Sequence, residues 1–352
     1  MKLSEEILLL QEQVDKCQKY VDILDNIIDK QFPIYNNIHK KLANSLKTTN
    51  IKLNEFFYAL YKRENESKNE AGKRLHRLIP VATDFMRLCQ LEGLFLMKKL
   101  DELLMRMNIP YNIDYGNLLG YVRTGDTIPW DDDMDIDILI EDAIKVTEMI
   151  TQFEDFKEFE IRCDKSGRMR FAAIGYPLFV DLIICVKVKN MKEFEANKAL
   201  FNRLSISRDK ESLLTIYNNG SDDALSFINS IYSELINGFV NIENSDNEND
   251  NESFFVRTCL LFMTKPNPTS IKNIFPLRRG IYDGIEVNIP NNPDTLLLQR
   301  YGDYWYLPSD TTHRRSSSKN IKKIMEFSDF IKSNDEKYYF ERILPVLAKM
   351  EE

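Results

Sequence analysis

The chain has 352 residues, of which 43% are hydrophobic and 29% are charged, and its formal net charge is −8 with a pI near 5.3. An acidic chain is a poor candidate for a nonspecific nucleic-acid binder, whereas the hydrophobic content and length support a sizeable core and room for two domains. The five cysteines are widely spaced without a Cys-x-x-Cys pair and the three histidines lie far apart, which argues against a disulfide framework or a zinc motif.

The first segment has apolar residues at alternating spacings of four and three: Leu3, Ile7, Leu10, Val14, Cys17, Val21, Leu24 and Ile28. This heptad pattern predicts a coiled coil, and Pro33 interrupts it before a second helical pattern. We therefore expect residues 1–75 to be a helical region that joins copies of the chain into a homo-oligomer, with a polar linker at 63–73. The alternative is a helical hairpin packed on the next domain.

No apolar core of signal-peptide type is present near the N-terminus, and no run approaches the 18 or so apolar residues of a membrane helix. The expected localisation is cytoplasmic, and the alternative is peripheral association with the inner face of the membrane.

Beyond this region, helical and strand-like segments are mixed, which predicts an α+β fold with a mixed sheet and flanking helices. Helices are expected at 78–107, on both sides of a break at 218–220 within 191–240, and at 254–263, 294–301 and 320–350. Strands are expected at 111–115, 133–140, 158–163, 168–174, 178–188 and 281–289. Residues 245–253 form a charged low-complexity segment that predicts a mobile acidic loop.

The most informative stretch has four aspartates at alternate positions: Asp131, Asp133, Asp135 and Asp137. In a strand these side chains share one face, while the intervening methionine and isoleucines line the other face. A row of carboxylates repels itself unless a cation lies among them, and Mg2+ or Mn2+ prefers oxygen ligands and commonly bridges to phosphates. A solvated acidic face is the alternative, but the apolar residues opposite argue against it.

Two further features accompany these acids. Asn117, after Gly116, is a candidate N-cap of a short helix, and a helix start preceded by glycine suits a phosphate, although such a pair is usually only a turn. Asp181 is the only charge in the apolar run 178–186, so we expect it to be a metal ligand or a base. The alternative is a structural ion pair with Arg168 or Arg170.

The segment GNLLGYVRTGDTIPWDDDMDIDI resembles the signature of the LicD/fukutin family of phosphotransferases. The later segment 275–308, FPLRRGIYDGIEVNIPNNPDTLLLQRYGDYWYLP, resembles the second conserved block of that family. The resemblance covers roughly residues 90–315. It implies a nucleotidyltransferase-like fold in a catalytic domain at 76–320, followed by a helical tail at 321–352.

The resemblance also implies an activity: transfer of phosphocholine or a polyol phosphate from a CDP-linked donor to a sugar hydroxyl, with release of CMP. The acceptor would be a glycan or lipid-linked sugar precursor of lipopolysaccharide, capsule or teichoic acid. By position, Asp133 and Asp135 match the metal-binding Asp-x-Asp pair and Asp181 matches the third acid. The donor-phosphate loop corresponds to Gly116, Asn117 and Arg123.

Several motif positions are less determined. Trp130 and Asp131 match positions of uncertain role, and Asp137, where a small residue is usual, is either an extra ligand or a strand-end acid. Arg278 and Arg279 are candidate phosphate ligands or a solvent-exposed basic pair. Asp181 is the preferred general base, and Arg123 would steady the leaving cytidylate. Two other functions stay open: a nucleotidyltransferase that moves the nucleotide itself, and a noncatalytic coiled-coil scaffold.

Overall fold

The computed structural model describes residues 60–163, 169–206, 224–241, 252–257, 268–305 and 321–351. The chain divides into two compact units, one of residues 1–79 and 303–314 and the other of residues 80–302 and 315–352. The heptad segment and nearly all of the acidic loop at 245–253 lie outside the described residues, so the coiled coil and the homo-oligomer stay predictions.

In the first unit, helix α3 (Lys68–His76) begins at a capping box. The Glu70 backbone N–H donates to Ser67 Oγ, and the Ser67 N–H donates to Glu70 Oε2 at 2.7 Å. Each residue thus satisfies a backbone donor of the other, which stabilises the first turn. The linker predicted at 63–73 is therefore wrong from residue 68 onward, because polar composition concealed a capped helix.

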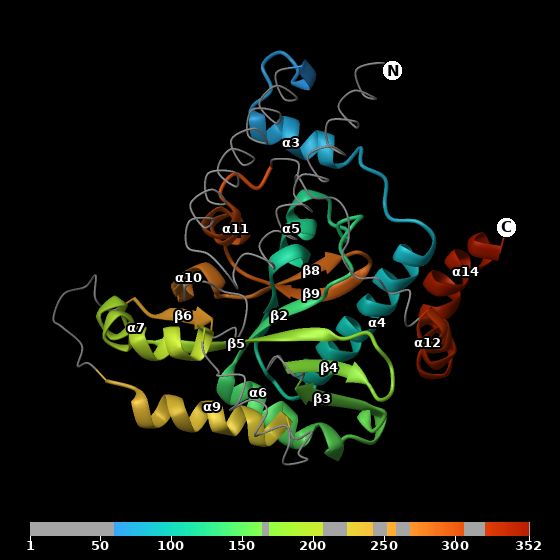
Figure 1. Ribbon diagram of the computed structural model, residues 1–352. Coiled ribbons are helices and arrows are strands. Elements are labelled where there is room, and N and C mark those ends of the chain that lie inside the picture. The colour runs from blue at the N-terminus through green and yellow to red at the C-terminus, as the bar shows by residue number, and fades with distance from the viewer. Residues whose placement is uncertain are drawn as a thin grey trace, which may run out of the picture. The chain divides into compact units, whose positions relative to one another are not determined.

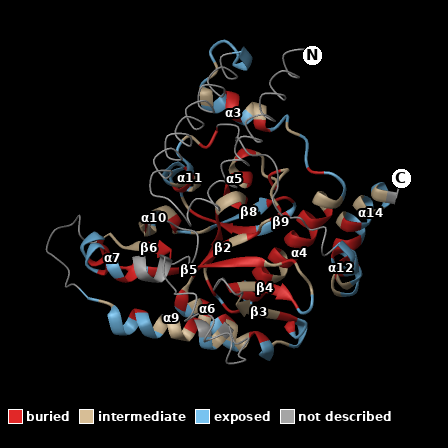
Figure 2. Cartoon of the chain, viewed as in Figure 1, coloured by how far each residue is buried: buried red, intermediate tan, exposed pale blue. Residues whose placement is uncertain are grey.

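The second unit contains a seven-stranded sheet, drawn in Figure 1. Its strands are β1 (Tyr111–Ile113), β2 (Asp135–Leu139), β3 (Phe159–Cys163), β4 (Met169–Ala173), β5 (Val180–Val188), β6 (Phe254–Arg257) and β7 (Pro268–Ser270). The order is β1-β2-β5-β4-β3, and β6 pairs with β5 and β7. Among the described strands of this sheet, β2 and β5 pair in parallel and the other pairs are antiparallel, which confirms the predicted mixed sheet. β5 is central and almost wholly buried (Figure 2), as its continuous apolar run requires.

Helices flank this sheet, as predicted: α4 (Asp84–Arg106), α5 (Tyr115–Arg123), α6 (Ile140–Met149), α7 (Met191–Ile206), α9 (Ala224–Gly238), α10 (Ile271–Ile274), α11 (Pro293–Tyr301), α12 (Ile321–Asn334), α13 (Glu336–Tyr338) and α14 (Leu344–Glu351). Short 3-10 turns follow α6 at Ile150–Gln152 and Glu154–Phe156, and a π-helical segment, Tyr339–Ile343, joins α13 to α14. In the described part of the chain, no helix has the length and apolarity needed to cross a membrane.

An aromatic cluster joins α4, β3, β4 and α12 in the core. The Phe159 and Phe171 rings are stacked with centroids 5.4 Å apart, and Phe95 meets Phe327 edge to face at 6.1 Å. Tyr176 lies 4.8 Å from the Phe327 ring. The helix α12 therefore contributes to the same core as the sheet.

A separate hairpin consists of β8 (Arg278–Tyr282) and β9 (Ile285–Ile289). Its turn residues, Asp283 and Gly284, have φ values of 43° and 79°, as a two-residue turn of type I′ requires. The single strand predicted at 281–289 is therefore two strands, and the Asp-Gly pair is the signal that identifies the turn. The helix predicted at 254–263 is also wrong where the chain is described, because residues 254–257 form β6.

Candidate active site

The structure brings Asp135 and Asp181 together on neighbouring strands. Asp135 is the first residue of β2 and pairs in register with Asp181 of the parallel strand β5. Directly opposed residues of adjacent strands project from the same face of a sheet. Two residues 46 positions apart in the printed sequence thus place their carboxylates side by side.

The acidic segment before β2 is not a strand. Pairing with β1 ends at Ile113–Ile136, apart from one hydrogen bond from the Asp114 N–H to Asp135 O, because the chain then turns into α5. The prediction of a strand from residue 133, with four aspartates on one face, is therefore wrong. Asp131 and Asp133 lie in an irregular segment that leads into β2, and only Asp135 and Asp137 belong to the strand.

Asn117 connects α5 to this segment. Its Nδ2 donates to Asp133 O at 2.9 Å, and its Oδ1 accepts from the Asp135 N–H at 2.6 Å. The N-cap of α5 is Asp114, whose side chain accepts from the Tyr115 N–H, so the predicted cap at Asn117 is wrong. Asn117 is instead buried in the first turn, where its amide holds the backbone on both sides of Met134.

Gly116 leaves room for a carboxylate at the start of α5. A Cβ atom at this position would lie 1.9 Å from Asp131 Oδ2. The other oxygen, Asp131 Oδ1, accepts from the Asp133 N–H at 3.3 Å. The absence of a side chain at Gly116 therefore allows Asp131 to lie against the helix start.

Charge around Asp135 is strongly negative. Burial raises the pKa of Asp135 well above its ordinary value, and the carboxylates of Asp181, Asp133 and Asp131 raise it further. Asp181 has a cationic neighbour, Arg170, whose Nε lies 2.8 Å from Asp181 Oδ1 and whose guanidinium lies 3.7 Å from the Phe179 ring centroid. The ion pair foreseen for Asp181 is thus present with Arg170, while Arg168 lies outside the described residues.

The composition of the site fits a hard divalent cation. Its side-chain donors around Asp135 are carboxylate oxygens, and their mutual repulsion is what such a cation relieves. Within the described ranges, no three Asp, Glu, His or Cys side chains are already gathered in a metal-binding arrangement. The residues fit Mg2+ or Mn2+ by chemistry and by proximity of charge.

Asp137, two residues along β2, has a different environment. Arg257 of β6 donates Nε to Asp137 Oδ1 at 3.0 Å and Nη2 to Oδ2 at 2.5 Å. The same Nη2 lies 2.8 Å from Asp114 Oδ2, which Arg300 of α11 contacts at 2.5 Å. Burial alone would raise the pKa of Asp114, but the two arginines bring it below its usual value. These two acids are therefore charge-compensated inside the core.

Sequence reasoning missed Arg257 and Arg300. Arg257 stands in the apolar run 254–263, and the argument that identified Asp181, a lone charge among apolar residues, applies equally to it. Arg300 also stacks on Tyr115, with its guanidinium 3.8 Å from the ring centroid. Tyr115 has a φ of 47°, a strained value for a side-chain-bearing residue, and it immediately precedes Gly116.

The remaining predicted residues lie elsewhere. Arg123 is buried at the end of α5, about 10 Å along the helix from Gly116. Trp130 is half-buried in the segment before β2. Arg278 is exposed on β8, whereas Arg279 forms a two-point ion pair with Asp101, with contacts of 2.6 and 2.8 Å.

A comparison with known protein families covers the part of this site that contains Asp133 and Asp135. Residues 108–177 match the family described as LicD/FKTN/FKRP, nucleotidyltransferase domain, which confirms the resemblance for that segment. It contains β1, α5 and β2, and it ends before Asp181 and the second block.

Two rickettsial proteins match a short part of the chain. Uncharacterized protein RP689 of Rickettsia prowazekii (strain Madrid E) is 51% identical over 59 residues, which is 17% of this chain and 22% of the relative. Uncharacterized protein RT0683 of Rickettsia typhi (strain ATCC VR-144 / Wilmington) is 49% identical over 59 residues, 17% of this chain and 19% of the relative. The chain thus spans about a fifth of the length of these curated relatives.

Proposed function

Because the chain carries a nucleotidyltransferase domain of the LicD family, we propose that it transfers a phospho-substituent from a CDP-linked donor to a sugar hydroxyl. The substituent would be phosphocholine or a polyol phosphate, the acceptor a cell-surface glycan or its precursor, and the by-product CMP. The observation that carries this proposal is the pairing of Asp135 with Asp181 in a site of excess negative charge. Such a site favours a bound cation, and phosphoryl transfer commonly uses metal ions to neutralise phosphate charge.

Asp133 and Asp135, with Asp181, would hold Mg2+ or Mn2+. When bound, this ion neutralises phosphate charge and favours ionisation of the acceptor hydroxyl. Asp181 is the proposed general base, since it comes from a different strand than the Asp-x-Asp pair. The acceptor oxygen forms the new bond to phosphorus, its proton goes to an Asp181 oxygen, and the bond from that phosphorus to the CMP oxygen breaks. Arg170 orients Asp181 through its contact with Oδ1.

Gly116 at the start of α5 is the proposed donor-phosphate contact, because the helix N-terminus favours negative charge. Asn117 has a different proposed role, since its amide already binds the backbone of Asp133 and Asp135. Asp137 is proposed as structural because Arg257 engages both of its oxygens. Arg123 as a contact for the cytidylate stays a prediction.

The test is CMP release from CDP-choline, CDP-glycerol, CDP-ribitol and CDP-ethanolamine, with Mg2+ or Mn2+ and a mixed glycan extract as acceptor. Asp135→Asn and Asp137→Asn form a matched pair, since both remove one carboxylate charge from the same strand. We expect CMP from one donor, abolished by Asp135→Asn and largely kept by Asp137→Asn in the folded fraction. The absence of both CMP release and donor binding by calorimetry would overturn the proposal.

The second candidate is transfer of the nucleotide itself, which the description of the matched family as a nucleotidyltransferase domain favours. Its product from CTP and a phosphorylated small molecule would be pyrophosphate rather than CMP, so one product assay separates the two reactions. The cytoplasmic compartment and self-association through residues 1–75 stay predictions of the sequence, and sedimentation of the full chain tests the latter.

A further inference from the structure

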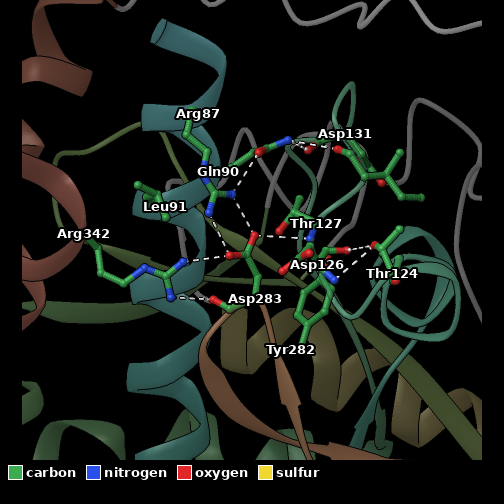
Figure 3. Close-up of polar contacts among 12 residues, drawn as sticks. Arg87, Gln90, Leu91, Thr124, Asp126, Thr127, Asp131, Tyr282, Asp283 and Arg342 are labelled. Atoms are coloured by element: carbon green, nitrogen blue, oxygen red, sulfur yellow. Dashed lines mark hydrogen bonds and ion pairs between the residues drawn. The ribbon is translucent and has the colours of Figure 1, made fainter. Parts of the chain in front are cut away.

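The acidic segment before β2 is not part of a strand ladder, although the Asp181 N–H of β5 donates to Met134 O at 2.7 Å. Side chains from other elements also position it. Gln90 of α4 is fully buried, and its Nε2 donates to Ile128 O at 2.9 Å and to Asp131 O at 2.8 Å. Figure 3 shows Gln90 reaching from α4 toward this backbone. The Gln90 amide group thus holds two backbone carbonyls of the chain shortly before Asp133.

The turn of the β8–β9 hairpin holds the start of the same segment. Asp283 Oδ2 accepts from the Thr127 N–H at 3.2 Å, and the Asp283 N–H donates to Gly125 O at 2.8 Å. Asp283 is itself held by Arg87, at 2.7 and 2.8 Å, and by Arg342 at 2.7 Å (Figure 3). The turn is therefore a fixed anchor for residues 125–127.

Tyr282 joins this anchor to the aspartates. It is fully buried, and its hydroxyl accepts from Asn117 Nδ2 at 3.2 Å. Asn117 in turn holds Asp133 O and the Asp135 N–H. The Tyr282 hydroxyl thus acts on Asp133 and Asp135 through Asn117. A buried hydrogen-bond network of this kind is sensitive to the loss of one member.

We propose that Gln90 and Tyr282 are positioning residues that set the affinity of the site for a divalent cation. The inference rests on the proposed function, because it takes Asp133 and Asp135 as cation ligands. Both residues act through the backbone of the acidic segment. The segment 275–308, which contains Tyr282 and Asp283, thereby contacts the segment that contains the aspartates.

The hairpin has support that does not depend on the Tyr282 hydroxyl. The ion pairs of Asp283 with Arg87 and Arg342 and the packing of β9 on α4 and β1 remain when that hydroxyl is removed. Tyr282→Phe therefore leaves the fold in place and releases one restraint on Asn117. Tyr338→Phe is the matched control, because Tyr338 is also buried and its hydroxyl donates one hydrogen bond, to Leu91 O of α4 rather than to Asn117 or the acidic segment.

The experiment measures Mn2+ binding to the full chain by calorimetry, together with hydrogen exchange of the amides at 125–135. We expect Tyr282→Phe and Gln90→Met to weaken Mn2+ binding by about tenfold, the effect of one lost buried hydrogen bond. Both variants should also speed exchange in this segment. Tyr338→Phe should neither weaken Mn2+ binding nor speed exchange in this segment. It should lower the melting temperature by about as much as Tyr282→Phe does.

Wild-type affinity and exchange in Tyr282→Phe would overturn the proposal, as would equal effects in Tyr338→Phe. Failure of the wild-type chain to bind Mn2+ would instead count against the metal site of the proposed function, and the cation role of Gln90 and Tyr282 would fall with it. In that case, faster amide exchange at 125–135 in Tyr282→Phe and Gln90→Met alone would still show that these two residues position the segment. Unchanged exchange in both variants would overturn the positioning role as well.

Discussion

Replacing Arg257 with methionine should strongly destabilise the protein. Arg257 is 4% exposed and contacts both Asp137, which is 2% exposed, and Asp114, which is fully buried. Its loss leaves Asp137 without the guanidinium, whereas Asp114 keeps Arg300. Removing one partner of a buried ion pair typically costs about 3–5 kcal/mol, a large part of a total stability of roughly 5–15 kcal/mol.

The double variant Arg257→Met/Asp137→Asn should recover most of this loss, because no uncompensated charge remains beside the methionine. Burial raises the pKa of Asp137 from 3.8 to about 7, so the native chain binds the proton more tightly than the unfolded chain. Arg257 lowers the pKa of Asp137, so in Arg257→Met that pKa should be higher still, and the penalty should shrink as the pH falls toward about 7 and change little below it. Urea unfolding of the four members of the cycle measures the coupling. A loss below about 1 kcal/mol in Arg257→Met, or additive effects in the double variant, would refute this reasoning.

Three further predictions concern other parts of the fold. Gly116→Ala should abolish most CMP release with little change in melting temperature, because its Cβ would displace the Asp131 carboxylate; full activity would contradict this. Burial raises the pKa of Glu92 well above 4.5, so native stability should fall as the pH rises above that value, and Glu92→Gln should remove this dependence from urea midpoints measured as the pH is raised from about 5. Phe327→Ala should cost about 3–5 kcal/mol of unfolding free energy, since its ring is fully buried against Phe95; a loss below about 1 kcal/mol would show that α12 is dispensable to the core.

The elements on which the site depends could be predicted from local sequence. The apolar run around Asp181 predicted a buried strand, and the lone charge in it predicted a functional carboxylate. The alternation from Asp135 onward predicted the strand beside it. The hydrophobic face of residues 78–107 likewise predicted α4, which spans Asp84–Arg106. These predictions are correct because burial selects apolar residues along a strand or on one face of a helix, and this pattern can be read without knowing the rest of the fold.

The corrected elements depend on partners far along the chain. The alternation at residues 131–134 resembles a strand, but β1 ends where α5 begins and does not pair with it, and β5 meets it through a hydrogen bond from the Asp181 N–H to Met134 O rather than a ladder. Gln90 and Asn117 replace that missing ladder with side-chain hydrogen bonds. Residues 254–257 form a strand because β5 extends beyond β4, and β6 pairs with this further part of β5, from Cys185 to Val188. A short apolar run has no periodicity that separates these outcomes.

The acids near β2 differ in their surroundings, and the difference bears on where a cation would bind. Asp137, Asp114 and Asp283 each lie within hydrogen-bond distance of at least one arginine, so their charges support the fold, and Asp181 beside Asp135 also contacts one, Arg170. Asp135 instead feels chiefly burial and the carboxylates of its neighbours, an arrangement that lowers stability in the absence of a cation. A fold that compensates Asp137 with an arginine on the next-but-one strand could have compensated Asp135 in the same way. The like charges gathered at Asp135 are the physical reason for proposing a cation, and with it the phosphate of a substrate, at that end of β2 rather than at Asp137.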